Sequence, residues 1–380
     1  MSIKIALFVL INCFLLPLSI QAEEKIKIGF LLKTMQEDRY QHDKRFFEER
    51  AKSLDVEVIF NSASNDHQFQ LKQFSELLVQ GCQVIVLQPV DTEKAEEMVR
   101  EAHARGIKVI GYDSLLRNGP LDVMVMQDSW EVGRQQGKEL EKWLKDKYGE
   151  VRGKIALIMG EPNDNNAMTM SLGVCETVGK DSTGMCKKIK EKICHDKEQC
   201  KVNEDGVGTK NPNLELVFAE EHKGWSADKA ADTTEEVLKK YPDIDAFLCN
   251  NSGLARGVIK TLRAYDRLDI SKIFIAGSEA DKANVEYINK GEQNLDICKK
   301  IRPLAETAVK IAVELAKNPL KEVNETFLKQ FVKSADCPEC SFKNVKNDYM
   351  DVPTIITPIV PITKENVHTH IDDGCAYISK

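Results

Sequence analysis

The sequence predicts an α/β protein of two lobes, each built around a parallel sheet. Three observations favour this fold class. Short apolar, β-branched runs alternate with helical patterns, and the alternation begins a second time near residue 123. The chain has 380 residues, 42% of them hydrophobic, which is enough for more than one core. Two such series contain more strands than one open sheet usually holds, so we expect two lobes.

The first series opens with a strand at 26–32, whose continuous apolar run (IKIGFLL) is typical of a strand buried on both faces. An amphipathic helix is expected at 43–54, because its apolar residues recur at helical spacing between charged ones. The same two patterns then repeat. They predict strands at 56–60, 84–88 and 108–112, and helices at 68–80 and 92–105.

The second series repeats this order. Its predicted strands lie at 123–126, 154–159, 214–219, 246–249 and 272–276, and its helices at 130–144, 227–240 and 254–265. Residues 179–212 do not fit, because they are rich in Lys, Glu, Asp, Gly and Cys and have little apolar periodicity. We expect a Cys-rich surface insertion there, pinned by disulfides.

The first 22 residues predict a cleaved signal peptide and therefore export. Lys4 precedes an apolar run from 5 to 20, and Ala22 precedes three charged residues. A membrane anchor is the alternative, but the run is shorter than the roughly 20 residues a span requires, and Pro17 interrupts it. A lipoprotein site at Cys13 would leave a very short apolar core.

The 11 cysteines fall into groups with different expected roles. Three lie in apolar runs and are expected to be small buried hydrophobes: Cys82, Cys249 and Cys298. Four cluster around the insertion and are expected to form local disulfides, whose pairing spacing alone does not give: Cys175, Cys186, Cys194 and Cys200. Zinc is the alternative, but structural zinc sites usually use two close Cys/His pairs, and only Cys337 and Cys340 form one.

Charge and motifs argue against several classes of function. The net charge of -7 gives no attraction for nucleic acid or anionic membranes. The sequence carries no nucleophile elbow, Gly-rich phosphate loop or His-rich metal motif. We therefore expect no enzyme, cofactor or metal site. Asp113 and Asp164 could imitate the carboxylate pair of a glycosidase, which remains the enzymatic alternative.

Polar and aromatic residues gather after the predicted strands, where parallel sheets bind ligands. The candidate ligand-binding residues are Arg39, Tyr40, Asp113, Ser114, Asp164, Asn166, Trp225, Asn250, Glu279 and Lys299. Any one of them alone is explained as a helix cap, a turn, core or solvated surface. As a set they combine side chains that hydrogen-bond to hydroxyl groups with aromatic faces that stack on a sugar ring. This mixture suits an uncharged, polyhydroxylated ligand.

At several motifs the sequence resembles the periplasmic sugar-binding proteins of the ribose/galactose type, most closely those for D-xylose. The motifs are Asp38-Arg39-Tyr40-Gln41, Gly111-Tyr112-Asp113, Pro162-Asn163-Asp164-Asn165-Asn166-Ala167, Gly224-Trp225 and Ile311-Ala312-Val313-Glu314-Leu315. The resemblance extends from Lys25 to about Gly374, apart from the insertion. It implies a type I periplasmic binding protein, in which two Rossmann-like lobes joined by three crossovers close on a ligand.

By this resemblance the crossovers fall near Gln127-Asp128, Lys299-Lys300 and Val352-Pro353. Lobe 1 then comprises 23–127 and 300–352, and lobe 2 comprises 128–299 and 353–380. The ligand contacts carried over from the family are Arg39, Asp113, Asp164, Asn166, Trp225, Asn250 and Lys299. Two positions depart from the xylose pattern: Ser114 stands where an Arg is usual, and Glu279 where an Asp is usual. A related small polyol is therefore the alternative to xylose.

The resemblance also implies partners. A monomer in the periplasm would deliver its sugar to the membrane permease of an ABC transporter. The alternative is a sensor that presents its closed form to a membrane chemoreceptor or kinase. A repressor of the same two-lobed type would begin with a helix-turn-helix, whereas this chain begins with the signal-peptide pattern.

Overall fold

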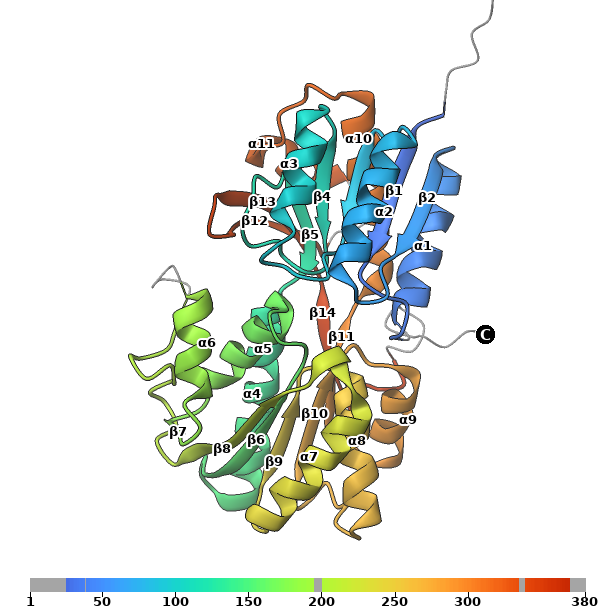
Figure 1. Cartoon of the computed structure of the whole chain (residues 1–380). Helices are drawn as coiled ribbons and strands as arrows, with labels where there is room; N and C mark the ends of the chain where they lie inside the picture. The colour runs from blue at the N-terminus through green and yellow to red at the C-terminus, as the bar shows by residue number, and fades with distance from the viewer. Residues whose placement is uncertain (1–24, 38, 195–199, 335–338, 370–380) are drawn as a thin grey trace, which may run out of the picture.

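The chain forms two α/β lobes, placed one above the other in Figure 1, as the sequence predicts. This computed structural model describes residues 25–37, 39–194, 200–334 and 339–369. The expected signal peptide, Asp38 and Cys337 lie outside these ranges. Each lobe contains a seven-stranded sheet that is parallel except for one strand at its edge.

The first lobe has the strand order β12-β13-β5-β4-β3-β1-β2. Its strands are β1 (Lys27–Leu32), β2 (Glu57–Ser62), β3 (Val84–Leu87), β4 (Lys108–Tyr112), β5 (Val123–Gln127), β12 (Ser341–Lys346) and β13 (Asp351–Thr357). Its helices are α1 (Arg39–Ser53), α2 (His67–Val79), α3 (Glu96–Ala104), α10 (Ile301–Lys317) and α11 (Glu325–Ser334).

The second lobe has the strand order β14-β11-β10-β9-β6-β8-β7. Its strands are β6 (Gly153–Met159), β7 (Lys180–Asp181), β8 (Leu214–Glu221), β9 (Ala246–Cys249), β10 (Phe274–Ser278), β11 (Leu295–Lys299) and β14 (Ile359–Thr363). Its helices are α4 (Ser129–Tyr148), α5 (Asn165–Cys175), α6 (Met185–Ile193), the short η1 (Lys223–Trp225), α7 (Ala227–Lys240), α8 (Ser252–Ala264) and α9 (Lys282–Lys290).

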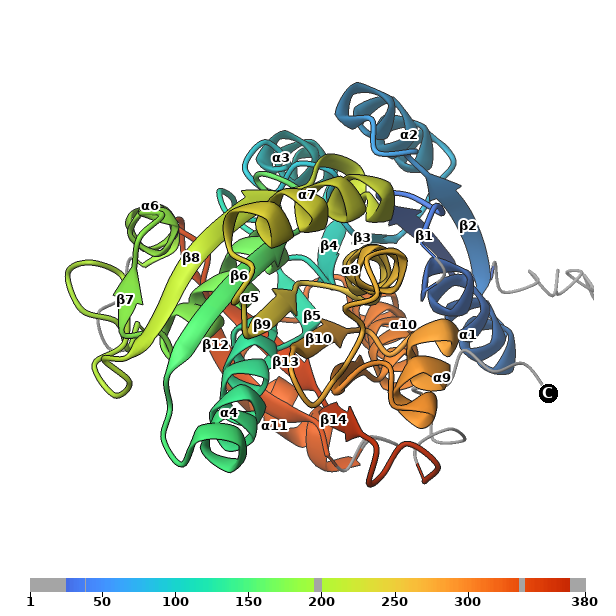
Figure 2. The ribbon, with the colours of Figure 1, turned by 90° about the horizontal axis from the view of Figure 1, so that it is seen from below.

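Both sheets are buried on their two faces, which explains their apolar strands. In β1, Phe30 packs in the core beneath α1 and α10, whereas Leu31 packs on the opposite side beneath α2 and α3. In β6, Leu157 packs toward α4 and α5, and Ile158 toward α7 and α8. Figure 2 shows α4 and α7 on opposite sides of this sheet. Because helices cover both faces of each sheet, the carboxyl ends of the strands are the part of the sheet that is left accessible to a ligand.

The chain passes between the two sheets three times, at Asp128, Lys300 and Pro358. The third position corrects the expectation of a crossover near Val352-Pro353. Strand β13 continues through Thr357 in the first sheet, where it pairs in parallel with β5. Residues 353–357 therefore belong to the first lobe, and β14 is the first strand of the final segment in the second sheet.

The Cys-rich insertion adds structure to the edge of the second lobe. Strand β7 pairs with β8, and α6 packs against α5. The four clustered cysteines form the expected local disulfides, with the pairs Cys175–Cys186 and Cys194–Cys200.

Two of the three cysteines expected to be small buried hydrophobes, Cys82 and Cys249, are free and buried. Cys298 is also buried, but it is disulfide-bonded, as is Cys340, and this corrects its expected role. None of the helices in the described parts of the chain combines the length and apolar character that a membrane crossing requires.

Candidate ligand-binding site

The candidate residues lie where the chain leaves the strands of the two sheets. In the first lobe, Arg39 is the first residue of α1, and Asp113 and Ser114 follow β4. In the second lobe, Asp164 caps the N-terminus of α5 by accepting a hydrogen bond from the N–H of Asn166, and Glu279 follows β10. Direct contacts join these residues across the lobes.

Arg39 is the centre of the cluster. Its Nη1 lies 3.0 Å from Asp113 Oδ1 in its own lobe and donates over 3.4 Å to Glu279 Oε1 of the second lobe. Its Nε donates to Asp43, which also accepts a hydrogen bond from the hydroxyl of Tyr112. All of these side chains are almost fully buried. One guanidinium is thus surrounded by three carboxylates, one of which comes from the opposite lobe.

A second set of contacts bridges the lobes beside Arg39. Asn166 Nδ2 donates to Asp113 Oδ2 over 3.2 Å and to Ser114 Oγ over 3.1 Å. Asp164 pairs with Lys33 of the first lobe at 2.9 Å, and its other oxygen accepts from Ser114 Oγ over 3.5 Å. Each contact uses a group that also hydrogen-bonds well to a sugar hydroxyl.

Tyr40 and Gln88 form the wall next to Asp113. Gln88 Nε2 donates to Asp113 Oδ2 over 2.9 Å and to the hydroxyl oxygen of Tyr40 over 3.1 Å. The Oε1 atom of Gln88 is buried without a hydrogen-bond partner among the described residues. Buried polar atoms are normally paired, so this atom marks a place where a ligand donor would be favourable.

Trp225 lies at the mouth of the cluster, in η1 after β8. Its ring packs on Gly160, because a Cβ built there would come within 2.3 Å of the indole. Lys33 Nζ lies 5.3 Å from the ring centroid. Within the described chain, the buried indole Nε1 has no hydrogen-bond partner. A hollow of about 230 Å³ opens beside Trp225, lined by both lobes.

Two candidates occupy different positions from the rest. Asn250 is fully buried, and its Oδ1 accepts hydrogen bonds from Gly160 N and Ser171 Oγ, both in the second lobe. It therefore supports the backbone beneath Trp225. Lys299, the last residue of β11, is buried beside the crossover at Lys300, and its charge acts on Asp113.

Burial and neighbouring charges shift the pKa values of Asp113 and Glu37 in opposite directions. Burial alone would raise the pKa of Asp113, but the charges of Arg39 and Lys299 outweigh it and lower the pKa below its ordinary value. Burial raises the pKa of Glu37 to about 7, against the charge of Lys33 and with the help of Glu279. Asp113 therefore accepts hydrogen bonds as a carboxylate, whereas Glu37 carries a proton for part of the time at neutral pH.

Backbone strain gathers at the same place. Five residues in or beside the cluster have a left-handed φ: Asp113 (62°), Asn163 (65°), Trp225 (52°), Glu279 (96°) and Ala280 (54°). Residues other than glycine rarely adopt this backbone conformation, and it persists only where the surrounding structure enforces it. Such strain is typical of binding and catalytic sites.

Residues 28–320 match the periplasmic binding protein domain. The chain belongs to this family. It is 27% identical to the D-xylose-binding periplasmic proteins of Haemophilus influenzae and Escherichia coli, in each case over 376 residues and 98% of this chain. These alignments cover 97% and 98% of the two relatives.

Solved structures of low identity share the fold. A carbohydrate transporter solute-binding protein from Chloroflexus aurantiacus, in complex with D-glucose, has a TM-score of 0.71 at 23% identity and covers 94% of this chain and 98% of its own. An ABC transporter solute-binding protein from Bacillus halodurans with bound myo-inositol has a TM-score of 0.68 at 22% identity, with coverage of 91% and 97%.

Four residues of this periplasmic binding protein's cluster were missed by sequence reasoning: Lys33, Glu37, Asp43 and Gln88. Lys33 directly follows β1, and Gln88 directly follows β3. The rule that ligands bind beyond the carboxyl ends of strands would have found both. Glu37 lies in the loop between β1 and α1 and accepts a hydrogen bond from Asn251 of the second lobe over 3.4 Å. No local sequence pattern predicts this contact.

A buried acid supports the loop that carries Glu279. Asp296 in β11 accepts hydrogen bonds from Ala280 N over 2.8 Å and Gln293 Nε2 over 3.0 Å. Ser252 Oγ lies 2.9 Å from both Asp296 Oδ2 and the carbonyl oxygen of Ser278. Since a hydroxyl has one proton, a protonated Asp296 satisfies both contacts by donating to Ser252. Burial raises the pKa of Asp296 to about 7.

Asp296→Asn is expected to remove a pH-dependent contribution to folding. Asp296 binds its proton more tightly in the folded chain than in the unfolded one, so its stabilising contribution is complete below about pH 4 and is lost as the pH rises to about 7. Relative to the variant, the wild type should lose up to about 1.4 kcal/mol of unfolding free energy per pH unit in this window. Denaturant titrations at several pH values measure the difference; a difference independent of pH would contradict the assignment.

Proposed function

We propose that this protein binds a neutral monosaccharide between its two lobes in the periplasm and delivers it to the membrane permease of an ABC transporter, without chemical conversion. The observation that carries the proposal is the buried polar cluster to which both lobes contribute. Arg39 and Asp113 come from the first lobe, and Asn166 and Glu279 from the second. A ligand held by such residues contacts both lobes at once and therefore favours their closure.

The chemistry of the cluster supports a sugar. Carboxylate, amide and guanidinium groups accept from or donate to vicinal hydroxyls, and charge-assisted hydrogen bonds of this kind are the strong ones. Trp225 at the mouth offers a flat face for the C–H side of a ring. The lowered pKa of Asp113 favours a role for its carboxylate as a hydrogen-bond acceptor. The general acid of a glycosidase would require a raised pKa.

The proposed ligand is a xylose-like pentose or a related small polyol. The relatives of highest identity above are named for D-xylose, and the solved neighbours hold D-glucose and myo-inositol. Ser114 and Glu279 distinguish this site from the xylose pattern. Ser114 Oγ contacts Asn166 and Asp164, so an arginine would not fit there without moving both. The proposed pocket therefore differs in shape from that of the xylose pattern at Ser114 and Glu279.

Neutral monosaccharides are expected to raise the melting temperature of the purified mature protein, with pentoses or small polyols giving the largest rise. A ligand that binds only the folded state at about 100 times its Kd stabilises by about 2.7 kcal/mol. A thermal-shift screen of monosaccharides, polyols, amino acids, peptides and metal ions measures this. The proposal fails if only amino acids, peptides or metal ions raise the melting temperature.

A further inference from the structure

The Cys-rich insertion makes its own contacts with the first lobe, in addition to those that surround Arg39. Lys192, near the end of α6, has its Nζ 3.0 Å from Glu93 Oε1 of the first lobe. The same Nζ donates to Asn163 Oδ1 over 2.6 Å. Figure 1 shows α6 at the outer edge of the second lobe, on the side of β12 and β13. One ammonium group thus joins the insertion, the first lobe and the loop before α5.

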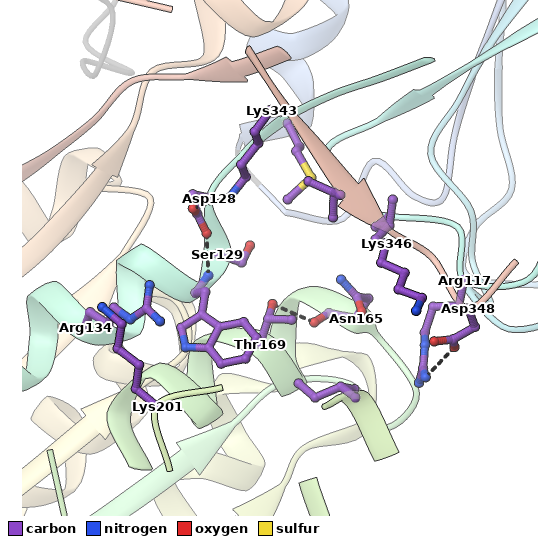
Figure 3. A pocket seen from close by; sticks show the side chains of 15 residues that line it. Arg117, Asp128, Ser129, Arg134, Asn165, Thr169, Lys201, Lys343, Lys346 and Asp348 are labelled. Carbon is purple, nitrogen blue, oxygen red and sulfur yellow. Dashed lines mark hydrogen bonds and ion pairs between the residues drawn. The ribbon is translucent and has the colours of Figure 1, made fainter. Parts of the chain in front are cut away.

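Arg117 of the first lobe also contacts Lys192, through the backbone of this residue. Its Nη2 donates to the backbone carbonyl of Lys192 over 2.7 Å. Asp348 holds this guanidinium in place at 2.6 Å (Figure 3). Arg117 is almost fully buried, so its contact with Lys192 is shielded from solvent. Ile193, the last residue of α6, lines with Arg117 and Asp348 a hollow of about 280 Å³ between the lobes.

The disulfides fix α6 to the second lobe. Cys175–Cys186 joins α6 to α5, and Cys186 and Ile189 are buried in the core of this lobe. Cys194–Cys200 closes the chain directly after α6. Because α6 is braced in this way, it moves with the second lobe, and its contacts with Glu93 and Arg117 must break when the lobes separate.

The insertion also reaches the candidate sugar site through Asn163. The side chain of Asn163 accepts from Lys192, and its carbonyl accepts from Thr92 Oγ1 of the first lobe over 2.8 Å. The next residue is Asp164, which pairs with Lys33. Asn163 has a φ of 65°, a conformation that needs support from its surroundings.

We propose that the insertion is a second clasp between the lobes, in which Lys192 stabilises the closed form and positions the loop that carries Asp164. The clasp rests on the proposed function, because closure is what retains the sugar. A contact present only in the closed form raises the population of that form, and a larger competent population lowers the apparent Kd. Lys192 is a positioning residue, since it touches the site only through Asn163.

Lys192→Ala tests the clasp on the mature full-length chain. We expect the bound sugar to dissociate about three- to tenfold faster, because the side chains of Lys192 and Glu93 are each about one-third exposed and their contacts contribute less than buried charged hydrogen bonds do. The radius of gyration of the sugar-free protein, measured by small-angle X-ray scattering, should increase. Lys192→Arg should retain most of both properties.

Lys188→Ala is the matched control. Lys188 lies one turn earlier on α6 and pairs with Glu221 of its own lobe at 3.3 Å, so its loss should leave closure and release unchanged. The clasp is refuted if Lys192→Ala behaves like Lys188→Ala in both measurements. The scattering measurement needs no sugar, so a wild type that binds no sugar would overturn the proposed function and still leave the clasp to be judged.

Discussion

Replacing Asp113 with asparagine is expected to weaken sugar binding about 10- to 150-fold while leaving the protein folded. Asp113 accepts from Gln88 and Asn166 and pairs with Arg39, so its carboxylate is fixed at the centre of the cluster. A hydrogen bond to a charged group contributes about 1.5–3 kcal/mol, which corresponds to this range of affinity. Asparagine keeps the shape and removes the charge.

Calorimetric titration with the best sugar from the thermal-shift screen measures this effect. Arg39 retains Asp43 and Glu279 as partners in the variant, which is why the fold should survive. Asp228→Asn, at a highly exposed position in α7, is the matched control and should bind as the wild type does. An affinity for Asp113→Asn within twofold of the wild type would place the ligand elsewhere.

Replacing Trp225 with alanine is expected to weaken binding about 30- to 2,000-fold, because the ring face that stacks on the sugar is lost. Burial of an aromatic side chain contributes about 1.5–3 kcal/mol, and aromatic stacking adds about 0.5–1.5 kcal/mol. Trp225→Phe keeps an aromatic face and should bind better than the alanine variant. Titration of both variants with the same sugar gives the comparison.

Gly160→Ala offers an independent test of the ring's position. A Cβ at this residue would lie 2.3 Å from the indole, so the ring must move although it is still present. We expect weakened binding, with an affinity between those of the wild type and Trp225→Ala. If both Gly160→Ala and Trp225→Ala bound sugar normally, Trp225 would have no part in the site.

Sequence patterns were sufficient for the α/β architecture of each lobe and for placing most of the cluster residues at the ends of strands. Apolar runs that alternate with amphipathic helices specify the two sheets, and the carboxyl ends of the parallel strands place Arg39 and Asp113 at the end of the first sheet and Glu279 at the end of the second. Glu37 was missed because its partner Asn251 lies in the opposite lobe. Such contacts depend on how the lobes meet, which no local periodicity encodes.

The third crossover and the disulfide pairing could not be predicted from the sequence, because both depend on how elements pack in three dimensions. The family resemblance places the crossover near Pro353, a residue that cannot donate a hydrogen bond to a strand ladder. Pro353 nevertheless lies inside β13, opposite Asn344 of β12, and the strand ends only at Thr357. The link between Cys175 and Cys186 forms because α5 and α6 pack together, which spacing along the chain does not reveal.

A crystal structure of the protein with its most stabilising monosaccharide tests the central claim most directly. We expect the sugar between the lobes, with hydroxyl groups within hydrogen-bond distance of Asp113, Arg39 and Asn166 and a ring face against Trp225. A sugar bound in another place, such as the hollow beside Arg117 and Lys346, with Arg39 still paired to Asp113 and Glu279 as it is here, would contradict it.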